Sequence, residues 1–125
     1  MEAINTLEYG EVKIASEVVA TIVGLAALEV KGVAGMSGGL ANGIAEKLGK
    51  KSLSKGVKLE IKEKEVIIDL YIIVDYGTKI PDISWEIQNN VIKVVETMIG
   101  LKAMNVNIHV QGVHFPQEPA KQENQ

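Results

Sequence analysis

A histidine and two aspartates are the residues of this sequence that are best suited to acid–base chemistry. His109 follows Asn105 and Asn107 in an alternating stretch near the C-terminus, and Asp69 and Asp75 lie in the apolar stretch "VIIDLYIIVDY". A histidine titrates near neutral pH and can act as a general base when a carboxylate holds it in place. The chain has no cysteine nucleophile and no serine in a nucleophile-elbow setting. We therefore expect His109 to lie on a solvated or interface face, and a hydrolase-like enzyme that uses it ranks third among the candidate functions.

The same two aspartates could bind a hard cation such as calcium. Two carboxylates without further oxygen ligands make a weak site for such an ion. Charged residues on a strand also block edge-to-edge aggregation of sheets, which explains Asp69 and Asp75 more simply. The sequence therefore predicts no metal site, no cofactor and no catalytic residue.

Hydrophobic periodicity predicts an α+β fold in which two main helices pack on a small, mixed, mainly antiparallel sheet. The first helix begins near Ser16 and ends at Gly32, and the second follows Pro81 and ends at Gly100. Strands are expected in "EVKI", "VKLEIK", "VIIDLYIIVDY" and "AMNVNIHVQGVHF". The third of these is apolar on both faces and belongs in the centre of the sheet.

Each helix carries a row of apolar residues that is expected to face the core. These residues are Val19, Val23, Ala26, Ala27 and Val30 in the first helix, and Ile83, Ile87, Val91, Val94, Val95 and Met98 in the second. The first helix is also apolar over most of its remaining surface, which includes Val18 and Leu25. We therefore expect the first helix to be buried on two sides.

Composition divides the chain into one domain and two polar ends. Residues 1–8 are expected to form a flexible N-terminal arm, residues 9–115 a single domain, and residues 116–125 a disordered polar tail. Between the first helix and the "VKLEIK" strand lies a segment rich in glycine and lysine. We expect it to be a mobile loop with one candidate short helix, on which Leu40, Ile44 and Leu48 share a face.

Five lysines in this loop and at the start of the "VKLEIK" strand make the strongest local charge imbalance of the chain: Lys47, Lys50, Lys51, Lys55 and Lys58. Lysines act as point charges toward lipid or nucleic-acid phosphates. The simpler explanation is a solvated loop, and peripheral contact with a membrane or another anion is the functional alternative.

The sequence "GVAG", residues 32–35, matches the bare G-x-x-G loop of KH-type RNA-binding domains. That loop joins two helices and has basic neighbours, whereas only Lys31 lies close here and a helix end explains Gly32. The formal net charge is −3 and the chain has no arginine, so bidentate recognition of guanine or phosphate is excluded. RNA binding therefore ranks second, and no DNA binding is expected.

Four apolar residues are candidates for a protein-interaction surface. Trp85 and Ile92 lie seven positions apart on the second helix, off its core-facing row, and Tyr71 and Ile73 lie on the less apolar face of the central strand. Either helices cover these residues within one chain, or a protein partner does.

The N-terminus carries acids where a signal peptide would carry a basic region, and no apolar run approaches the roughly 20 residues that span a bilayer. Since cysteine is also absent, a cytoplasmic location without a direct transmembrane segment is expected.

The order and wording of these segments resemble the alkaline shock protein family, the cell-envelope stress response domain of Gram-positive and related bacteria. The resemblance covers residues 9–113 and is most specific in "DLYIIVDYG", the Ile–Pro junction at the start of the second helix, and "VNIHVQGV".

This resemblance implies a small α+β domain that is not known as an enzyme. The best-known family members are abundant, self-associate, and are held at the membrane by a separate transmembrane partner that carries a similar domain. From the resemblance we expect a noncatalytic structural or adaptor protein of the envelope stress response. It would act through self-association and a membrane-anchoring protein partner, and would lie peripherally at the cell membrane.

Overall fold

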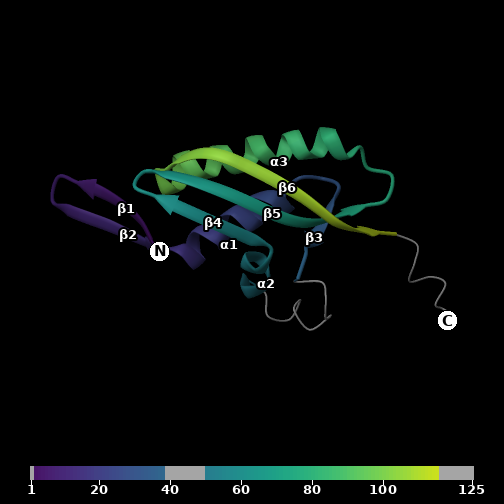
Figure 1. Cartoon of the computed structure of the whole chain (residues 1–125), viewed down its shortest axis with the longest axis horizontal. Coiled ribbons are helices and arrows are strands. Elements are labelled where there is room, and N and C mark those ends of the chain that lie inside the picture. Colours follow the sequence, from purple (N-terminus) through teal and green to yellow (C-terminus); the bar gives the residue numbers. More distant parts are fainter. Residues whose placement is uncertain (1, 39–49, 116–125) are drawn as a thin grey trace.

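A four-stranded mixed sheet forms the centre of the protein. The structure, a computed structural model, describes residues 2–38 and 50–115. The strands of this sheet are β3 (Val33–Met36), β4 (Val57–Lys62), β5 (Glu65–Asp75) and β6 (Lys102–His114). Strand β5 pairs in parallel with β6 along one edge, and antiparallel with β4 and then β3 along the other (Figure 1). The predictions of a mixed, mainly antiparallel sheet and of a central "VIIDLYIIVDY" strand are confirmed.

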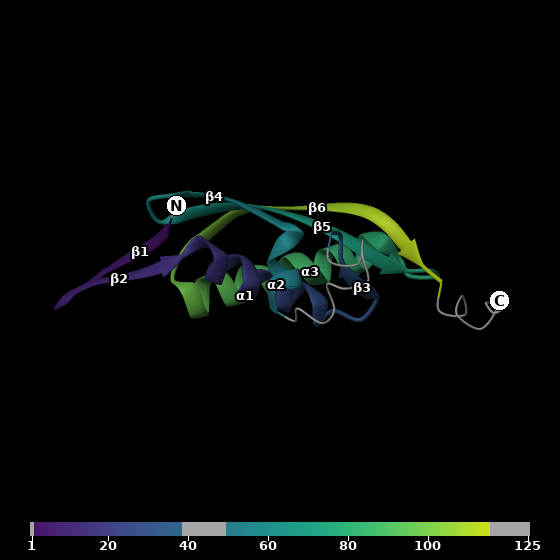
Figure 2. The ribbon, with the colours of Figure 1, turned by 90° about the horizontal axis from the view of Figure 1, so that it is seen from below.

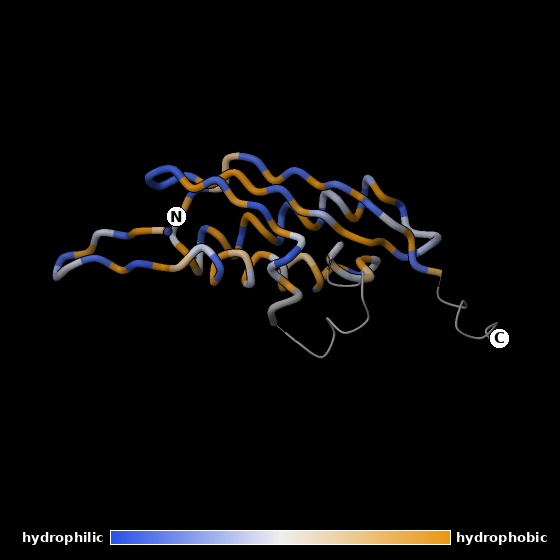
Figure 3. The backbone as a smooth tube through the Cα atoms, turned by 60° about the horizontal axis from the view of Figure 1, so that its bottom comes forward, coloured by the Kyte–Doolittle hydropathy of each residue, from blue (hydrophilic) through white to orange (hydrophobic). Residues whose placement is uncertain are grey.

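Within the described residues, two helices cover one face of this sheet and leave the other face open. Helix α1 (Ser16–Leu28) and helix α3 (Ile80–Val94) contact each other and lie in one layer beneath the strands (Figure 2). Alternate residues of β5 from Val66 to Val74 are fully buried under them. The intervening residues, from Ile67 to Asp75, face the open side and are half-buried. Figure 3 shows the resulting alternation of apolar and polar positions along the strands.

The end of the second helix differs from the prediction. Helix α3 continues into a π-helical turn, η2 (Val95–Ile99), which ends at Gly100 with φ 84°. Met98, which was expected in the core, is 63% exposed, and Ile99 is buried in its place. A π-helical turn contains more residues than an α-helical turn, so each residue rotates less about the axis. The buried position therefore moves from residue 98 to residue 99.

The first helix is buried on one side only. All five residues predicted for its core-facing row are buried. Val18 and Leu25, however, are 47% and 50% exposed, so the expectation that this helix is covered on two sides is wrong within the described residues. Their side chains form an apolar surface on the outside of α1.

An N-terminal hairpin stands apart from the main sheet. Strands β1 (Glu2–Leu7) and β2 (Gly10–Ala15) pair antiparallel with each other and extend away from the body of the protein (Figures 1 and 2). Residues 2–7 thus form a strand where the sequence predicted a flexible arm. Ala3 is fully buried, and the Asn5 side-chain amide donates a hydrogen bond of 2.8 Å to the carbonyl of Ile99. These contacts fix the base of the hairpin to the end of the second helix.

A short helix, α2 (Lys50–Lys55), precedes β4 in the segment rich in glycine and lysine. It packs on α1 at Gly24, where a Cβ atom would collide with the backbone carbonyl of Leu53. The candidate short helix around Leu40, Ile44 and Leu48 lies outside the described residues, as does the tail at residues 116–125.

Candidate functional site

The candidate acid–base residues meet on the open face of the sheet. In the parallel pairing of β5 with β6, Tyr71 lies beside His109 and Asp69 beside Asn107. The His109 Nε2 atom lies 3.0 Å from Asp69 Oδ1, and the Asn107 side-chain amide donates to the same oxygen at 3.2 Å. The aspartate that holds His109 in place is therefore Asp69, on the neighbouring strand.

Aromatic and cationic groups complete this cluster. The imidazole of His109 stacks on the Tyr71 ring with 4.4 Å between centroids and 9° between planes. Lys58 Nζ, on the neighbouring strand β4, lies 5.4 Å from the centroid of the same ring. The hydrogen bond from His109 is the largest cause that lowers the pKa of Asp69, with smaller contributions from Asn107 and Lys58. The cluster therefore keeps Asp69 ionised and fixes the orientation of His109.

The described residues leave this cluster open to solvent. The side chains of His109 and Asp69 are 42% and 33% exposed on a sheet face that neither α1 nor α3 covers. In residues 2–38 and 50–115, no three histidine or acidic side chains gather where they could hold a metal ion. What the arrangement can do chemically is present a hydrogen-bonded polar network to solvent or to a protein that docks on this face.

A second histidine–aspartate pair, which the sequence pattern did not indicate, lies at the other end of the same face. His114 Nδ1 is 3.2 Å from Asp75 Oδ1. His109 and His114 are five positions apart and would point to opposite faces of a regular strand. A β-bulge in β6 after Val110 adds one residue and returns His114 to the open face. The sequence signal that could have revealed the bulge is Gly112, which follows directly.

The predicted interaction residues fall on two separate surfaces. Trp85 and Ile92 lie on the outside of α3 and line a groove of about 380 Å³ between this helix and β6. Tyr71 and Ile73 lie on the open face of the sheet, half-buried, and the Ile73 side chain packs over Gly112. The sequence grouped the four residues, and the structure brings them together only in pairs.

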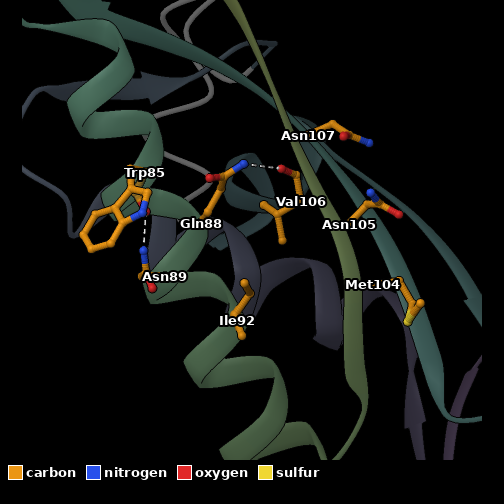
Figure 4. Close-up of a pocket in the computed structure, with 8 residues that line it drawn as sticks. All are labelled: Trp85, Gln88, Asn89, Ile92, Met104, Asn105, Val106 and Asn107. Atoms are coloured by element: carbon orange, nitrogen blue, oxygen red, sulfur yellow. Dashed lines mark hydrogen bonds between the residues drawn. The ribbon is translucent and has the colours of Figure 1, made fainter.

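The groove between α3 and β6 has no ionisable lining residue (Figure 4). Trp85 is 65% exposed at its margin. The Gln88 side-chain amide donates to the carbonyl of Val106 at 3.0 Å, and the Asn89 amide donates to the carbonyl of Trp85 at 2.8 Å. The lining residues are Trp85, Gln88, Asn89, Ile92, Met104, Asn105, Val106 and Asn107.

The "GVAG" stretch and the five lysines are the two remaining candidate motifs. Residues 33–35 of the "GVAG" stretch lie in strand β3, so the KH-type interpretation as a loop between two helices is wrong. Of the five lysines, Lys55 and Lys58 lie among the described side chains, and Lys58 is engaged over Tyr71. Lys47 and the side chains of Lys50 and Lys51 lie outside that part.

Among the helices of the described residues, none combines the length and the apolar character that a membrane-spanning segment needs.

Comparison with known proteins identifies relatives in Gram-positive bacteria. The chain is 40% identical over 106 residues to the uncharacterized protein YqhY of Bacillus subtilis, which covers 85% of this chain and 78% of that protein. It is 40% identical over 108 residues to the uncharacterized protein YloU of the same organism, which covers 85% of this chain and 90% of that protein. A stress response regulator gls24 homolog of Streptococcus pyogenes is 33% identical over 102 residues, which covers 81% of this chain and 57% of that protein. No solved structure gives a significant match.

A family model also matches the chain, over residues 4–115. This match includes both helices, the whole main sheet and the groove between α3 and β6. The resemblance to the alkaline shock protein family is confirmed by this match and by the gls24 relative. The chain therefore belongs to the alkaline shock protein family, which is described as having a cell envelope-related function.

Proposed function

We propose that the protein is a noncatalytic structural or adaptor protein of the bacterial envelope stress response. It acts on the cytoplasmic side of the membrane through self-association and a partner protein. The family description and the relative named as a stress response regulator support the envelope and stress setting. The observation that carries the protein-binding role is the exposed Trp85 beside an uncharged groove.

A tryptophan in such a position is typical of a protein-binding surface. Tryptophan supplies a large rigid contact area and is enriched among the residues that dominate binding energy. Ile92 and Met104 extend the apolar surface around it. Because the groove carries no charge, covering it removes no ion from water, and a partner need only supply hydrogen bonds to the amide side chains of the lining.

The open position of the His109 cluster supports a noncatalytic role. Catalysis by a histidine–aspartate pair requires a bound substrate held in reacting geometry and shielded from water. In the part of the chain that the structure describes, His109 and Asp69 instead lie partly exposed on the sheet face opposite the helices. Together with Tyr71 and Ile73, this face offers a second contact surface for a partner.

The lysines before and in β4 supply a weaker electrostatic contact. A lysine near an anionic membrane surface contributes about 1 kcal/mol. Lys55 and Lys58 are exposed, and Lys47, Lys50 and Lys51 belong to the same stretch of sequence. Peripheral membrane contact therefore adds to binding through a protein anchor and does not replace it.

The test combines cell fractionation with sedimentation of the purified protein. We expect the native protein to enrich with the membrane fraction and to form assemblies at tens of micromolar. Trp85→Ala is expected to reduce one or both at least about tenfold, as the loss of a central aromatic contact does. Tyr76→Ala is the matched control, because Tyr76 is 68% exposed but lies outside the groove. A monodisperse monomer without membrane enrichment would contradict the proposal.

A further inference from the structure

Strand β6 has a long free edge. It is 13 residues long and pairs with β5 alone among the strands that the structure describes. Figure 1 shows β6 at the outside of the sheet, with β5 between it and β4. A free strand edge presents backbone N–H and C=O groups that another strand can pair with, and natural proteins usually block such an edge.

The middle of this edge lacks the usual blocking features. From Ala103 to Ile108 the strand contains neither a charged residue nor a proline. Two β-bulges, at Met104 and Gln111, bound a regular stretch over residues 105–110. Bulges commonly end strand pairing, so this regular stretch is the part that is shaped to pair.

The backbone of this stretch already uses one outward group. The Val106 carbonyl accepts the Gln88 amide from α3, which shows that this carbonyl points away from β5 (Figure 4). In a strand, alternate residues direct their backbone groups to the same edge. The N–H and C=O groups of Val106 and Ile108 therefore point outward, and those of Asn107 point toward β5. A carbonyl can accept two hydrogen bonds, so the Gln88 contact leaves room for a second donor.

We propose that β6 pairs antiparallel with β6 of a second copy of this chain, about a twofold axis at Asn107, so that one sheet runs through both copies. This inference rests on the proposed function, because it supplies the contact for self-association. In a twofold contact each residue near the axis meets its own copy or a near neighbour. A charged side chain near the axis would therefore face the same charge in the second copy. Residues 103–108 contain no charged side chain.

The side chains around the axis are compatible with their own copies. Pairing about Asn107 places Asn107 opposite Asn107, Asn105 opposite His109, and Val106 opposite Ile108. Amides both donate and accept hydrogen bonds, so two asparagines can pair without a charge. Val106 and Ile108 lie on the helix-covered face, where the two apolar surfaces join. Helix α3 of each copy lies on this same side, so the exposed Trp85 and the half-buried Ile92 extend the apolar contact.

Cysteine cross-linking tests the pairing directly, because the chain has no cysteine of its own. Residues opposite each other in a non-hydrogen-bonded antiparallel pair have Cα atoms about 4.5 Å apart, which suits a disulfide. Under mild oxidation, Asn107→Cys is expected to form a covalent dimer by itself. Asn105→Cys and His109→Cys are each expected to remain mostly monomeric alone and to form a dimer when mixed. Lys62→Cys, on the exposed edge strand β4, is the control and is expected to remain monomeric.

A second variant tests the same edge without oxidation. Asn107→Lys would bring two ammonium groups together at the axis, and we expect at least a tenfold weaker association by sedimentation. Thr6→Lys adds the same charge to an exposed strand position outside the edge and is expected to leave association unchanged. Equal thermal unfolding of the two variants would show that both are folded.

The outcomes separate this inference from the proposed function. Dimers in the pattern above support the edge pairing. If the protein assembles but the β6 cysteines cross-link no better than Lys62→Cys, the edge pairing is overturned and self-association stands on another surface. If the protein is monomeric yet enriched with the membrane, the edge pairing is overturned and the role of a partner protein stands. A monomer without enrichment overturns both.

Discussion

The two edges of the main sheet are built in opposite ways. The β4 edge is six residues long and carries Lys58, Glu60 and Lys62 at alternate positions. The β6 edge is 13 residues long, and its middle carries amides and apolar residues beside the groove at Trp85. Lysines on an edge strand prevent pairing with other strands. One edge of this sheet is therefore protected by charge, whereas the other is, in the pairing proposed above, covered by a second copy.

Adding charge to the β6 edge should make the two edges alike, and we expect it to weaken self-association more than any other change. A chain with Asn105→Lys and Asn107→Lys would carry β6 lysines at alternate positions, as β4 does. We expect at least a hundredfold weaker self-association, about 2.7 kcal/mol, because four ammonium groups would meet around one axis. Analytical ultracentrifugation measures the association, and far-UV circular dichroism checks the fold. Unchanged association would mean that the two edges do not differ in function.

Helices α1 and α2 pack beside β4, and they contact each other closely at Gly24 of α1. We expect Gly24→Ala to lower the free energy of unfolding by about 1–3 kcal/mol, because the added methyl group overlaps the Leu53 carbonyl. Chemical denaturation measures this loss. Thr21→Ala on the same helix is the control and should change stability by about 0.5 kcal/mol or less. Self-association through β6 should survive Gly24→Ala, since helix α1 contacts the sheet near β4, at the edge opposite β6.

The Asp69 cluster links the two edges across the open face, and its effect on stability should depend on pH. The hydrogen bond from His109 holds the pKa of Asp69 below its usual 3.8. An aspartate with a lowered folded-state pKa stabilises the protein above its unfolded pKa, and this stabilisation is lost as pH falls through the folded value.

We therefore expect the native protein to lose a few tenths of a kcal/mol more than Asp69→Asn when the pH falls from about 5 to below 3.8, after allowance for solvent screening at this partly exposed site. Urea unfolding at a series of pH values measures the difference. Parallel curves for the two proteins would show that the cluster adds nothing to folding stability.

The ion pair on the β4 edge should have the smallest effect. Lys62 Nζ and Glu60 Oε2 are 3.4 Å apart with both side chains largely exposed. Glu60→Gln should change the free energy of unfolding by less than about 0.5 kcal/mol, because solvent screens such pairs. It should also leave the β4 edge unable to pair, even with Lys62→Cys as the cross-linking probe, since Lys58 remains. A new cross-link at Lys62→Cys in the Glu60→Gln background would contradict this.

Much of the fold follows from the sequence, because its strongest signals are long and periodic. Strand β5 is apolar on both faces, and this alone placed it at the centre of the sheet. The helical spacing of Trp85 and Ile92 predicted positions off the core-facing row, and in the structure Trp85 is exposed while Ile92 is half-buried beside the groove. Alternation also separated Tyr71 and Ile73 from the buried face. Alternation could not show that Tyr71 and Ile73 lie on the sheet face opposite the helices, and so on a different surface from Trp85. A strand pattern separates two faces but does not say which one the helices cover.

The remaining differences come from single-residue irregularities. One π-helical turn exchanged Met98 for Ile99, and one bulge brought His114 to the face of His109. Such insertions shift the phase of a pattern without changing its composition, so periodicity does not reveal them. The hairpin strand β1 was missed because its residues alternate weakly and are held by Asn5 and Ala3, through contacts with residues far away in the sequence.

The parallel pairing of β5 with β6 also determines the order in which the domain can form. Asp69 and His109 are 40 positions apart, and helix α3 lies between them. A pairing of this kind closes a long loop and is slow compared with the β4–β5 hairpin. On a ribosome, β6 is also made after the other strands that the structure describes and after both helices that cover the sheet. The uncharged edge therefore appears only when the rest of the domain is present to hold it, which limits the time in which a nascent chain could aggregate through it.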